Sequence, residues 1–525
     1  MTKVRNILFI MCDQLRWDYL SCSGHPHLKT PNIDRLAKMG VRFDRTFVNA
    51  PVCGPSRMSF YTGRTVFSHG ATWNYVPLPI GEFTIGDYLI QQGVRVAVAG
   101  KTHITQDAAG RARLGLTQHT DIDLVVSEGN IEPWERDDGI HPPKVDKRGL
   151  AYNQWLAKLG YDGDNPWDTW ANSGEGPNGE IMSGWALRNS IYPARIKEQH
   201  SETPYITDRG LEFIRECGDK PWLLHLSYIK PHWPYIAPRP YFGMYTRDHV
   251  VAAVKHERER ANPHPVYKAF MDMEIGQSFA RDDVRDAVIP AYMGLTRQID
   301  DHLGRVLAWL ERAGRMKDTM IVFASDHGDY LGDHWMGEKE LFHEPSVRVP
   351  LIIVDPSKEA DATRGTVRSE MVEAIDLVPT FLDAYGSKVS RHRLEGRSLM
   401  PLLHDAARPG AWRDAVLSEL DYAFYQAREF TGKGANDARA FMLRTERWKY
   451  IHYKGFPPQL FDLQEDPSEF VDLGLSAAHD GVRREMHGRL LERLTDRRNR
   501  ITVEDDWVLG ARDRELAAGI VIGRW

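Results

Sequence analysis

The sequence has few cysteines and no long hydrophobic run. Its 525 residues include four cysteines: Cys12, Cys22, Cys53 and Cys217. Because these show no paired spacing, we expect no disulfide framework, and a reducing compartment is favoured. The apolar run 6–12 is followed at once by Asp13 and lacks a small-residue cleavage site, so it predicts a strand rather than a signal peptide. No segment is long enough to span a bilayer. We therefore expect a cytoplasmic protein without a membrane partner.

The sequence also lacks an excess of charge of one sign, internal repeats and low-complexity tracts. The formal net charge is −6, and charged residues make up 27% of the chain beside 42% apolar residues. This composition is typical of a folded globular protein and gives no support for nucleic acid as a partner. The length is sufficient for a large domain with a smaller companion.

Helix and strand patterns alternate along most of the chain. Predicted strands cover about 5–12, 41–48, 94–100, 221–228 and 319–325, and predicted helices cover about 30–40, 84–93, 208–218 and 286–313. This alternation predicts an α/β fold with a large, mostly parallel central sheet and helices on both faces. Further on, residues 447–463 predict a hairpin and 482–498 a helix with a polar face. We expect a large domain over 1–400 and a smaller C-terminal α+β subdomain with a tail over 401–525.

The alternation fades between about 105 and 205, which we interpret as an insertion over the functional site. This stretch contains five tryptophans: Trp134, Trp155, Trp167, Trp170 and Trp185. Aromatic residues in a loop are typical of a substrate pocket wall. They are equally typical of a small satellite core under a long loop. The sequence leaves both alternatives open.

Polar residues that could take part in catalysis or metal binding follow the predicted strands, at the point where each strand ends. They are Asp13, Lys101 and His103, His232, and the pair Asp326 and His327. In open α/β sheets, ligands bind outside the carboxyl ends of the strands. Any one of these positions is a weak signal, but together they predict a site at one edge of the sheet.

Two carboxylates and an imidazole make a candidate metal site. Asp13, Asp326 and His327 supply these groups and leave coordination positions open, as a catalytic metal requires. The alternative for 326–329 is a polar turn in which Asp326 caps a helix. Cys53 stands at the predicted start of a helix, where backbone N–H groups favour an anion and lower a thiol pKa. The hard ligands favour an oxygen nucleophile at this position, and a buried small hydrophobe fits poorly with the Gly, Pro, Ser and Arg that follow.

The segment around Cys53 resembles the signature of the type I sulfatase family. Residues 53–64, CGPSRMSFYTGR, match the pattern C-x-P-S-R-x-x-x-x-T-G-R. "GKTH" at 100–103 resembles the family's G-K-x-H, and "DHGDYLGDH" at 326–334 followed by Lys339 resembles its second metal segment. "QLFDLQEDPSEFVDL" at 459–473 resembles its C-terminal motif. The resemblance covers most of the chain and implies the fold of the alkaline phosphatase superfamily, with the sulfatase catalytic domain in residues 1–400.

The resemblance also implies a role for each matched residue. In this family the cysteine is oxidised to formylglycine, whose hydrated aldehyde is the nucleophile, so a formylglycine-generating enzyme is an expected partner. Asp13, Asp326 and His327 would hold one divalent metal together with an oxygen of residue 53. Arg57 and Lys101 would fix that residue and its developing charge. His103 would remove the proton of its second hydroxyl, which expels sulfate and restores the aldehyde.

The resemblance also implies that His232 and Lys339 bind the nonbridging oxygens of the ester, most strongly in the transition state. One of these two, or Asp326, would give a proton to the leaving oxygen.

Two departures from the commonest sulfatase pattern concern the metal. This chain has Cys12-Asp13 and Asp326-His327, where many calcium sulfatases have two aspartates and Asp-Asn. This pairing resembles choline sulfatases and phosphonate monoester hydrolases of the same superfamily. A nitrogen ligand favours manganese over calcium or zinc.

We therefore expect a sulfatase acting on small sulfate esters, aryl esters above all. The alternative is a phosphonate monoester or phosphodiester hydrolase with the same nucleophile, and both activities can coexist. Those hydrolases tend to have Tyr and Thr in place of Lys101 and His103, so the retained pair favours sulfate. A third alternative, a non-catalytic anion-binding protein, is disfavoured because every base, cation and ligand position is filled. The tail 501–525 ends in "IVIGRW", and we expect it to pack on a neighbouring subunit of a homo-dimer or tetramer.

Overall fold

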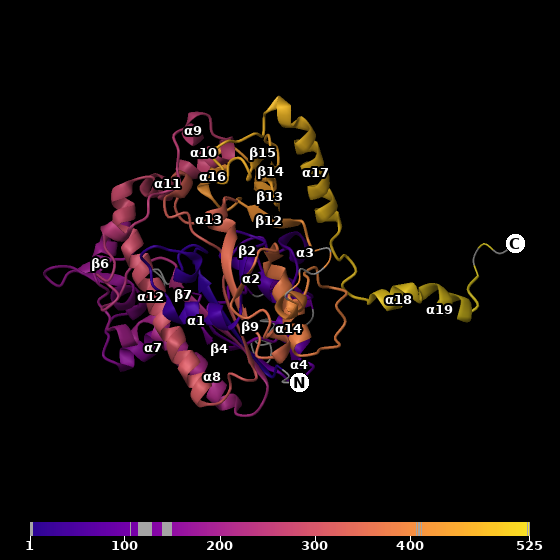
Figure 1. Cartoon of the computed structure of the whole chain (residues 1–525), viewed down its shortest axis with the longest axis horizontal. Coiled ribbons are helices and arrows are strands. Elements are labelled where there is room, and N and C mark those ends of the chain that lie inside the picture. The colour runs from indigo at the N-terminus through magenta and orange to yellow at the C-terminus, as the bar shows by residue number, and fades with distance from the viewer. Residues whose placement is uncertain are drawn as a thin grey trace.

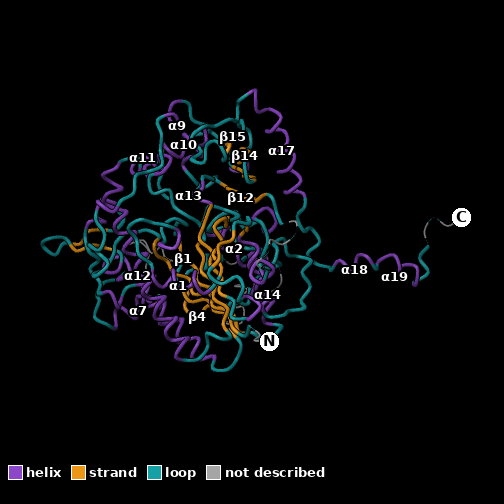
Figure 2. The backbone as a smooth tube through the Cα atoms, viewed as in Figure 1, coloured by secondary structure: helices purple, strands orange, loops and turns teal. Residues whose placement is uncertain are grey.

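One large sheet lies at the centre of the protein with helices on both sides (Figures 1 and 2). The computed structural model describes residues 4–521 except 106, 114–128, 139–149, 406, 408, 409 and 411, and also residue 523. The strands of the sheet are β1 (Asn6–Asp13), β2 (Val41–Phe47), β3 (Arg95–Gly100), β4 (Glu132–Arg136), β7 (Trp222–Pro231), β8 (Thr319–Ser325), β9 (Arg348–Val354), β10 (Thr366–Arg368) and β11 (Val372–Glu373). Over the described residues their order is β10-β2-β9-β8-β1-β7-β3-β4, with β11 also paired to β2. β1 runs parallel to both of its neighbours, and β9 is antiparallel to both of its own. The predicted α/β fold with a mostly parallel sheet is confirmed.

Both faces of the sheet are buried, because helices cover each of them. Odd-numbered residues of β1 from Ile7 to Met11 pack in one apolar cluster, and even-numbered residues from Leu8 to Cys12 pack in another. The helices of the first cluster include α2 (Cys53–Thr62), α4 (Ile85–Ile90) and α14 (Leu377–Ala384), and those of the second include α1 (Pro31–Met39), α8 (Glu202–Cys217) and α12 (Asp282–Arg312). This explains why the central strands are continuous apolar runs.

The helix ends follow the sequence signals. α1 begins at Pro31, which is tolerated in the first turn because its missing N–H has no partner there, and it ends before Gly40. α8 and α12 begin at Glu202 and Asp282, four to six residues before their predicted starts. In the described residues, no helix combines the length and apolarity needed to cross a membrane.

A second sheet stands at the top of the view in Figure 1. It is antiparallel in the order β12 (Ala415–Asp421), β13 (Arg439–Thr445), β14 (Trp448–Tyr453) and β15 (Gln459–Asp462). α17 (Asp480–Thr495) packs on it through Met486 and Leu490. The predicted hairpin corresponds to β14 and β15. Short helices α18 (Asp505–Leu509) and α19 (Ala511–Ala517) extend away from the body of the protein.

The inserted tryptophans mainly form core. Trp167 is fully buried, and Trp134, Trp155 and Trp170 pack against the apolar cluster that contains α8 and α12. Parts of the insertion, 114–128 and 139–149, lie outside the described residues. Trp185 packs against the same cluster, and its ring also lies 5.5 Å from that of Trp233, the neighbour of His232.

Candidate active site

Cys53 is the first residue of α2, as its sequence context predicts, and its side chain is buried. The next residue must be glycine, since a Cβ on Gly54 would come within 2.7 Å of the Asn74 backbone. The N–H of Gly54 donates to Oδ1 of Asn74 at 2.7 Å. Pro55 has no N–H and Ser56 donates to the carbonyl of Val52 at 3.0 Å, so these groups of the first helical turn are already accounted for.

The predicted metal ligands meet at the sulfur of Cys53. Asp13 ends β1, and Asp326 and His327 directly follow the parallel neighbour β8. Ligand atoms of all four residues lie within 4.8 Å of one another. Nε2 of His327 is 3.1 Å from Sγ of Cys53 and 3.6 Å from Oδ1 of Asp13. Two hard carboxylates, one imidazole and residue 53 suit a divalent cation with oxygen-rich coordination.

The guanidinium of Arg57 binds both metal-ligand carboxylates, Asp13 and Asp326. Its Nε lies 2.8 Å from Oδ2 of Asp326, and its Nη2 lies 3.3 Å from Oδ2 of Asp13. Its Nη1 donates to the carbonyl of Lys101 and to Oγ of Ser227, each at 2.8 Å. The guanidinium is completely buried, so its rigid fork fixes the spacing of the carboxylates.

Positive charge surrounds the nucleophile position. Nζ of Lys339 lies 3.4 Å and Nζ of Lys101 3.7 Å from Sγ of Cys53. Burial acts to raise the pKa of the Cys53 thiol, but Lys101, Lys339 and His327 outweigh it and hold the pKa well below its ordinary value. The site therefore stabilises an anion at residue 53.

His232 and Lys339 form a second polar pair beside Cys53. Nδ1 of His232 lies 2.7 Å from the carbonyl oxygen of Trp233, so this nitrogen carries the hydrogen. Nε2 therefore accepts from Nζ of Lys339 at 3.3 Å. Burial lowers the pKa of His232 to about 3, which makes the imidazole neutral at physiological pH.

The loop after β3 brings His103 to the same place. His103 has a positive φ of 54°, and Oδ1 of Asp138 accepts its backbone N–H at 2.8 Å and that of Thr102 at 3.0 Å. A hydrogen bond from His103 also lowers the pKa of the Cys53 thiol, although its effect is smaller than those of burial and of the nearby cations. Nδ1 of His103 is buried and has no partner among the described residues.

Sequence reasoning missed the residues that hold this site. Oε1 of Gln14 accepts from Nζ of Lys339 at 3.0 Å, and its Nε2 donates to Oδ2 of Asp329 at 2.6 Å. The hydroxyl of Tyr235 donates to the same oxygen of Asp329. Gln14 directly follows Asp13 at the end of β1. Its place among the polar residues at the strand ends was therefore the signal that could have identified it.

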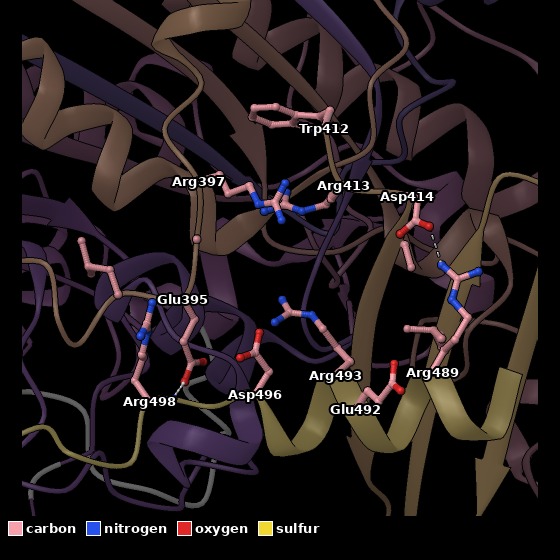
Figure 3. Close-up of a pocket in the computed structure, with 14 residues that line it drawn as sticks. Glu395, Arg397, Trp412, Arg413, Asp414, Arg489, Glu492, Arg493, Asp496 and Arg498 are labelled. Carbon is pink, nitrogen blue, oxygen red and sulfur yellow. Dashed lines mark hydrogen bonds and ion pairs between the residues drawn. The ribbon is translucent and has the colours of Figure 1, made fainter. Parts of the chain in front are cut away.

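A large cavity of about 550 Å³ lies away from these residues, between segment 394–397 and α17 (Figure 3). Arginines that line this cavity largely link the region of residues 373–376 to later segments of the chain. Arg413 binds both oxygens of Asp376, and Glu373 accepts from Arg493 at 3.2 Å. None of the predicted site residues lines this cavity.

The comparisons with known proteins agree with the geometry. The family model described as "Sulfatase" matches residues 5–387. The chain belongs to the sulfatase family. A second model, "N-sulphoglucosamine sulphohydrolase, C-terminal", matches residues 332–496. Two family models thus cover both sheets of this sulfatase.

Three similar proteins carry different activities in their names. The multifunctional alkaline phosphatase superfamily protein PehA of Trinickia caryophylli is 32% identical and covers 92% of this chain and 93% of its own. An arylsulfatase of Clostridium perfringens is 26% identical, covering 89% of this chain and 90% of its own. The crystal structure of the phosphonate monoester hydrolase of Agrobacterium radiobacter has a TM-score of 0.78 and 28% identity, covering 94% of this chain and 95% of its own.

Proposed function

We propose that this protein hydrolyses small sulfate monoesters, with aryl esters as its main substrates, through a formylglycine made from Cys53 and one divalent metal. The observation that carries the proposal is the convergence on Cys53 of the metal-ligand set with Lys101, His103 and Lys339. Around this residue the cations outnumber the two carboxylates, which suits an anionic ester. A formylglycine-generating enzyme would be the maturation partner.

The formylglycine would supply the nucleophile, and the metal ion would supply part of the positive charge. Asp13, Asp326, His327 and residue 53 would hold the cation, which polarises ester oxygens, and the hydrated aldehyde would supply the attacking oxygen. Manganese is the metal we favour, because His327 adds nitrogen to an oxygen-rich set.

The chain's own residues position the ester and move its protons. Lys101 and Arg57 lie behind residue 53 and neutralise the carboxylates beside it. Lys339 donates to the ester oxygens, and because Nε2 of His232 accepts one of its protons, the ammonium keeps its direction. Asp326 already accepts from Arg57 and from two backbone N–H groups. Of the three candidate donors, this leaves Lys339 to protonate the leaving oxygen.

His103 then removes the proton that releases sulfate. Its backbone is fixed by Asp138, and its buried Nδ1 has no hydrogen-bond partner among the described residues. This residue is the reason for placing sulfate before phosphonate.

The alternative is a phosphonate monoester or phosphodiester hydrolase with the same nucleophile. It is favoured by the similarity to a phosphonate monoester hydrolase over almost the whole chain. The deciding experiment compares kcat/KM for 4-nitrophenyl sulfate and 4-nitrophenyl phenylphosphonate, with mass spectrometry of the peptide containing residue 53. We expect formylglycine, higher kcat/KM for the sulfate, and no turnover by Cys53→Ala. An unmodified thiol in fully active protein would overturn the mechanism, and a clear phosphonate preference would establish the alternative.

The same proposal includes an assembly and a compartment. Trp507, Leu509 and Leu516 on the protruding α18 and α19 are about half exposed or more, and such side chains favour burial against a second copy. A homo-dimer or tetramer in the cytoplasm therefore remains our expectation, and cell fractionation tests the compartment. The division into domains at about residue 400 likewise stays a proposal.

A further inference from the structure

Three aromatic side chains from distant parts of the sequence meet in one group. The rings of Trp73 and Phe424 are stacked, with centroids 5.2 Å apart and an interplanar angle of 8°. Tyr425 meets Trp73 edge-on at 4.5 Å. Both are favourable arrangements of aromatic rings, so the three side chains hold one another in place. We call Trp73, Phe424 and Tyr425 the aromatic wall.

The aromatic wall is connected to the reaction centre on two sides. Trp73 precedes Asn74, which accepts the N–H of Gly54 directly after the nucleophile. The hydroxyl of Tyr425 donates to Oε1 of Glu340 at 2.9 Å, and Glu340 directly follows Lys339.

The outer face of the aromatic wall is open. Trp73 is only 9% exposed, but Phe424 is 54% exposed, so one face of its ring remains uncovered. A flat ring can stack on this uncovered face.

We propose that the aromatic wall binds the leaving group, and that sulfate esters of planar aromatic alcohols with two fused rings are the preferred substrate class. This inference rests on the proposed function of the same site. A naphthyl ring offers more area for stacking than a phenyl ring, and a short alkyl chain offers almost none. Because this contact involves no reacting atom, it binds ground state and transition state equally and acts on KM.

The test compares Phe424→Ala with Phe430→Ala on three substrates. Phe430 is a matched control, since it is an equally exposed aromatic residue at 50% in the adjacent helix α16 (Gln426–Phe430) and makes none of these ring contacts. The substrates are 2-naphthyl sulfate, phenyl sulfate and propyl sulfate. For Phe424→Ala we expect KM for 2-naphthyl sulfate to rise about 3- to 10-fold with kcat unchanged, a smaller rise for phenyl sulfate and none for propyl sulfate. Equal effects on all three esters, or the same effect in Phe430→Ala, would overturn the inference.

A second measurement separates this inference from the proposed function. Calorimetric binding of 2-naphthyl sulfate to Cys53→Ala needs no turnover, so the change in affinity caused by a further Phe424→Ala reports on the aromatic wall. We expect the affinity to fall about 3- to 10-fold when Phe424→Ala is added. Unchanged affinity would contradict the inference even if sulfates are hydrolysed. Preference for the sulfate of a quaternary ammonium alcohol over 2-naphthyl sulfate would contradict it too, whereas absence of any sulfatase turnover with intact binding would contradict the proposed function instead.

Discussion

Nζ of Lys339 lies 3.3 Å from Nε2 of His232, and the direction of this hydrogen bond is fixed. Nδ1 of His232 donates to the carbonyl of Trp233, so Nε2 has only a lone pair to offer. Gln14 accepts a second proton of the same ammonium at 3.0 Å. The ammonium is thus oriented by two acceptors and points its remaining proton toward residue 53.

Replacing Lys339 tests this arrangement. We expect Lys339→Ala to lower kcat about 10²- to 10³-fold, because it removes a charge directed at the transition state. The loss should grow as the leaving phenol becomes more basic, since poorer leaving groups depend more on protonation. A series of substituted phenyl sulfates measures this slope, with the exposed Lys388→Ala as the control. A loss that is the same for every leaving group would show that Lys339 does not protonate the leaving oxygen.

Removing metal ligands tests the metal site. We expect about one manganese ion per chain by elemental analysis, and none in Asp326→Ala. Arg57→Lys should weaken metal binding about 10- to 100-fold, because lysine cannot hold both carboxylates. The control is Glu259→Ala, at the separate buried cluster of Glu259, His334 and His343, which should leave the metal content unchanged. Calcium at full occupancy would refute the choice of manganese, and metal loss in Glu259→Ala would move the ion to the other cluster.

The positions of Asp13, Asp326 and His327 could be predicted because of how parallel strands are built. β1 and β8 are neighbours in register, so their carboxyl ends bring polar residues to one edge. Cys53 could be placed at a helix start because glycine and proline follow it. These signals are local in the sequence, and the fold only had to bring them together.

The supporting contacts could not be predicted, because they join segments far apart in the chain. Tyr425 and Glu340 are separated by 85 positions, and no periodic pattern relates them. Asp138 binds the backbone N–H groups of Thr102 and His103 and also pairs with Arg136, and no sequence motif marks these contacts. The tryptophans of the insertion were ambiguous for another reason: an aromatic residue in a loop has the same sequence signature in a core and in a pocket. Packing resolves that ambiguity in favour of core: Trp167 is fully enclosed, and the other four pack against the same apolar cluster.

A buried histidine beside the nucleophile helix makes stability depend on pH. His69 accepts the N–H of Ala71 at Nδ1, so its Nε2 donates to Oγ of Ser59 in α2. Burial lowers the pKa of His69 to about 3 in the folded protein, from an ordinary value of 6.5. Between these pH values the unfolded chain binds more protons, so the free energy of unfolding falls as pH decreases from about 6.5 to 3.

Urea unfolding at pH 7 and pH 5 measures this effect. We expect His69 to contribute about 1–2 kcal/mol to the difference in unfolding free energy between the two conditions. His69→Gln should reduce the difference by that amount, and the exposed His27→Gln should not. An unchanged pH dependence in His69→Gln would show that another group is responsible.

The C-terminal arm gives a prediction about assembly. Leu509 is 78% exposed and Trp507 57% exposed on the protruding helices. Light scattering should show a dimer or tetramer for the whole chain and a smaller species after removal of residues 501–525. Residues 522, 524 and 525 of this tail lie outside the described structure. A monomer both with and without the tail would rule the assembly out.

The last prediction concerns the choice between sulfate and phosphonate. His103 contributes a hydrogen bond to Cys53, and its proposed task is to remove the proton whose loss releases sulfate. If so, His103→Ala should still attack the ester at a normal rate and then stall. Rapid-quench measurements with 4-nitrophenyl sulfate should show a burst of about one nitrophenol per site, followed by turnover slowed about 10²- to 10⁴-fold. The wild-type protein should show no burst of this size and should prefer the sulfate over the phosphonate. If the protein prefers the phosphonate and His103→Ala keeps normal activity, product release does not depend on this base. The protein would then be a phosphonate monoester or phosphodiester hydrolase.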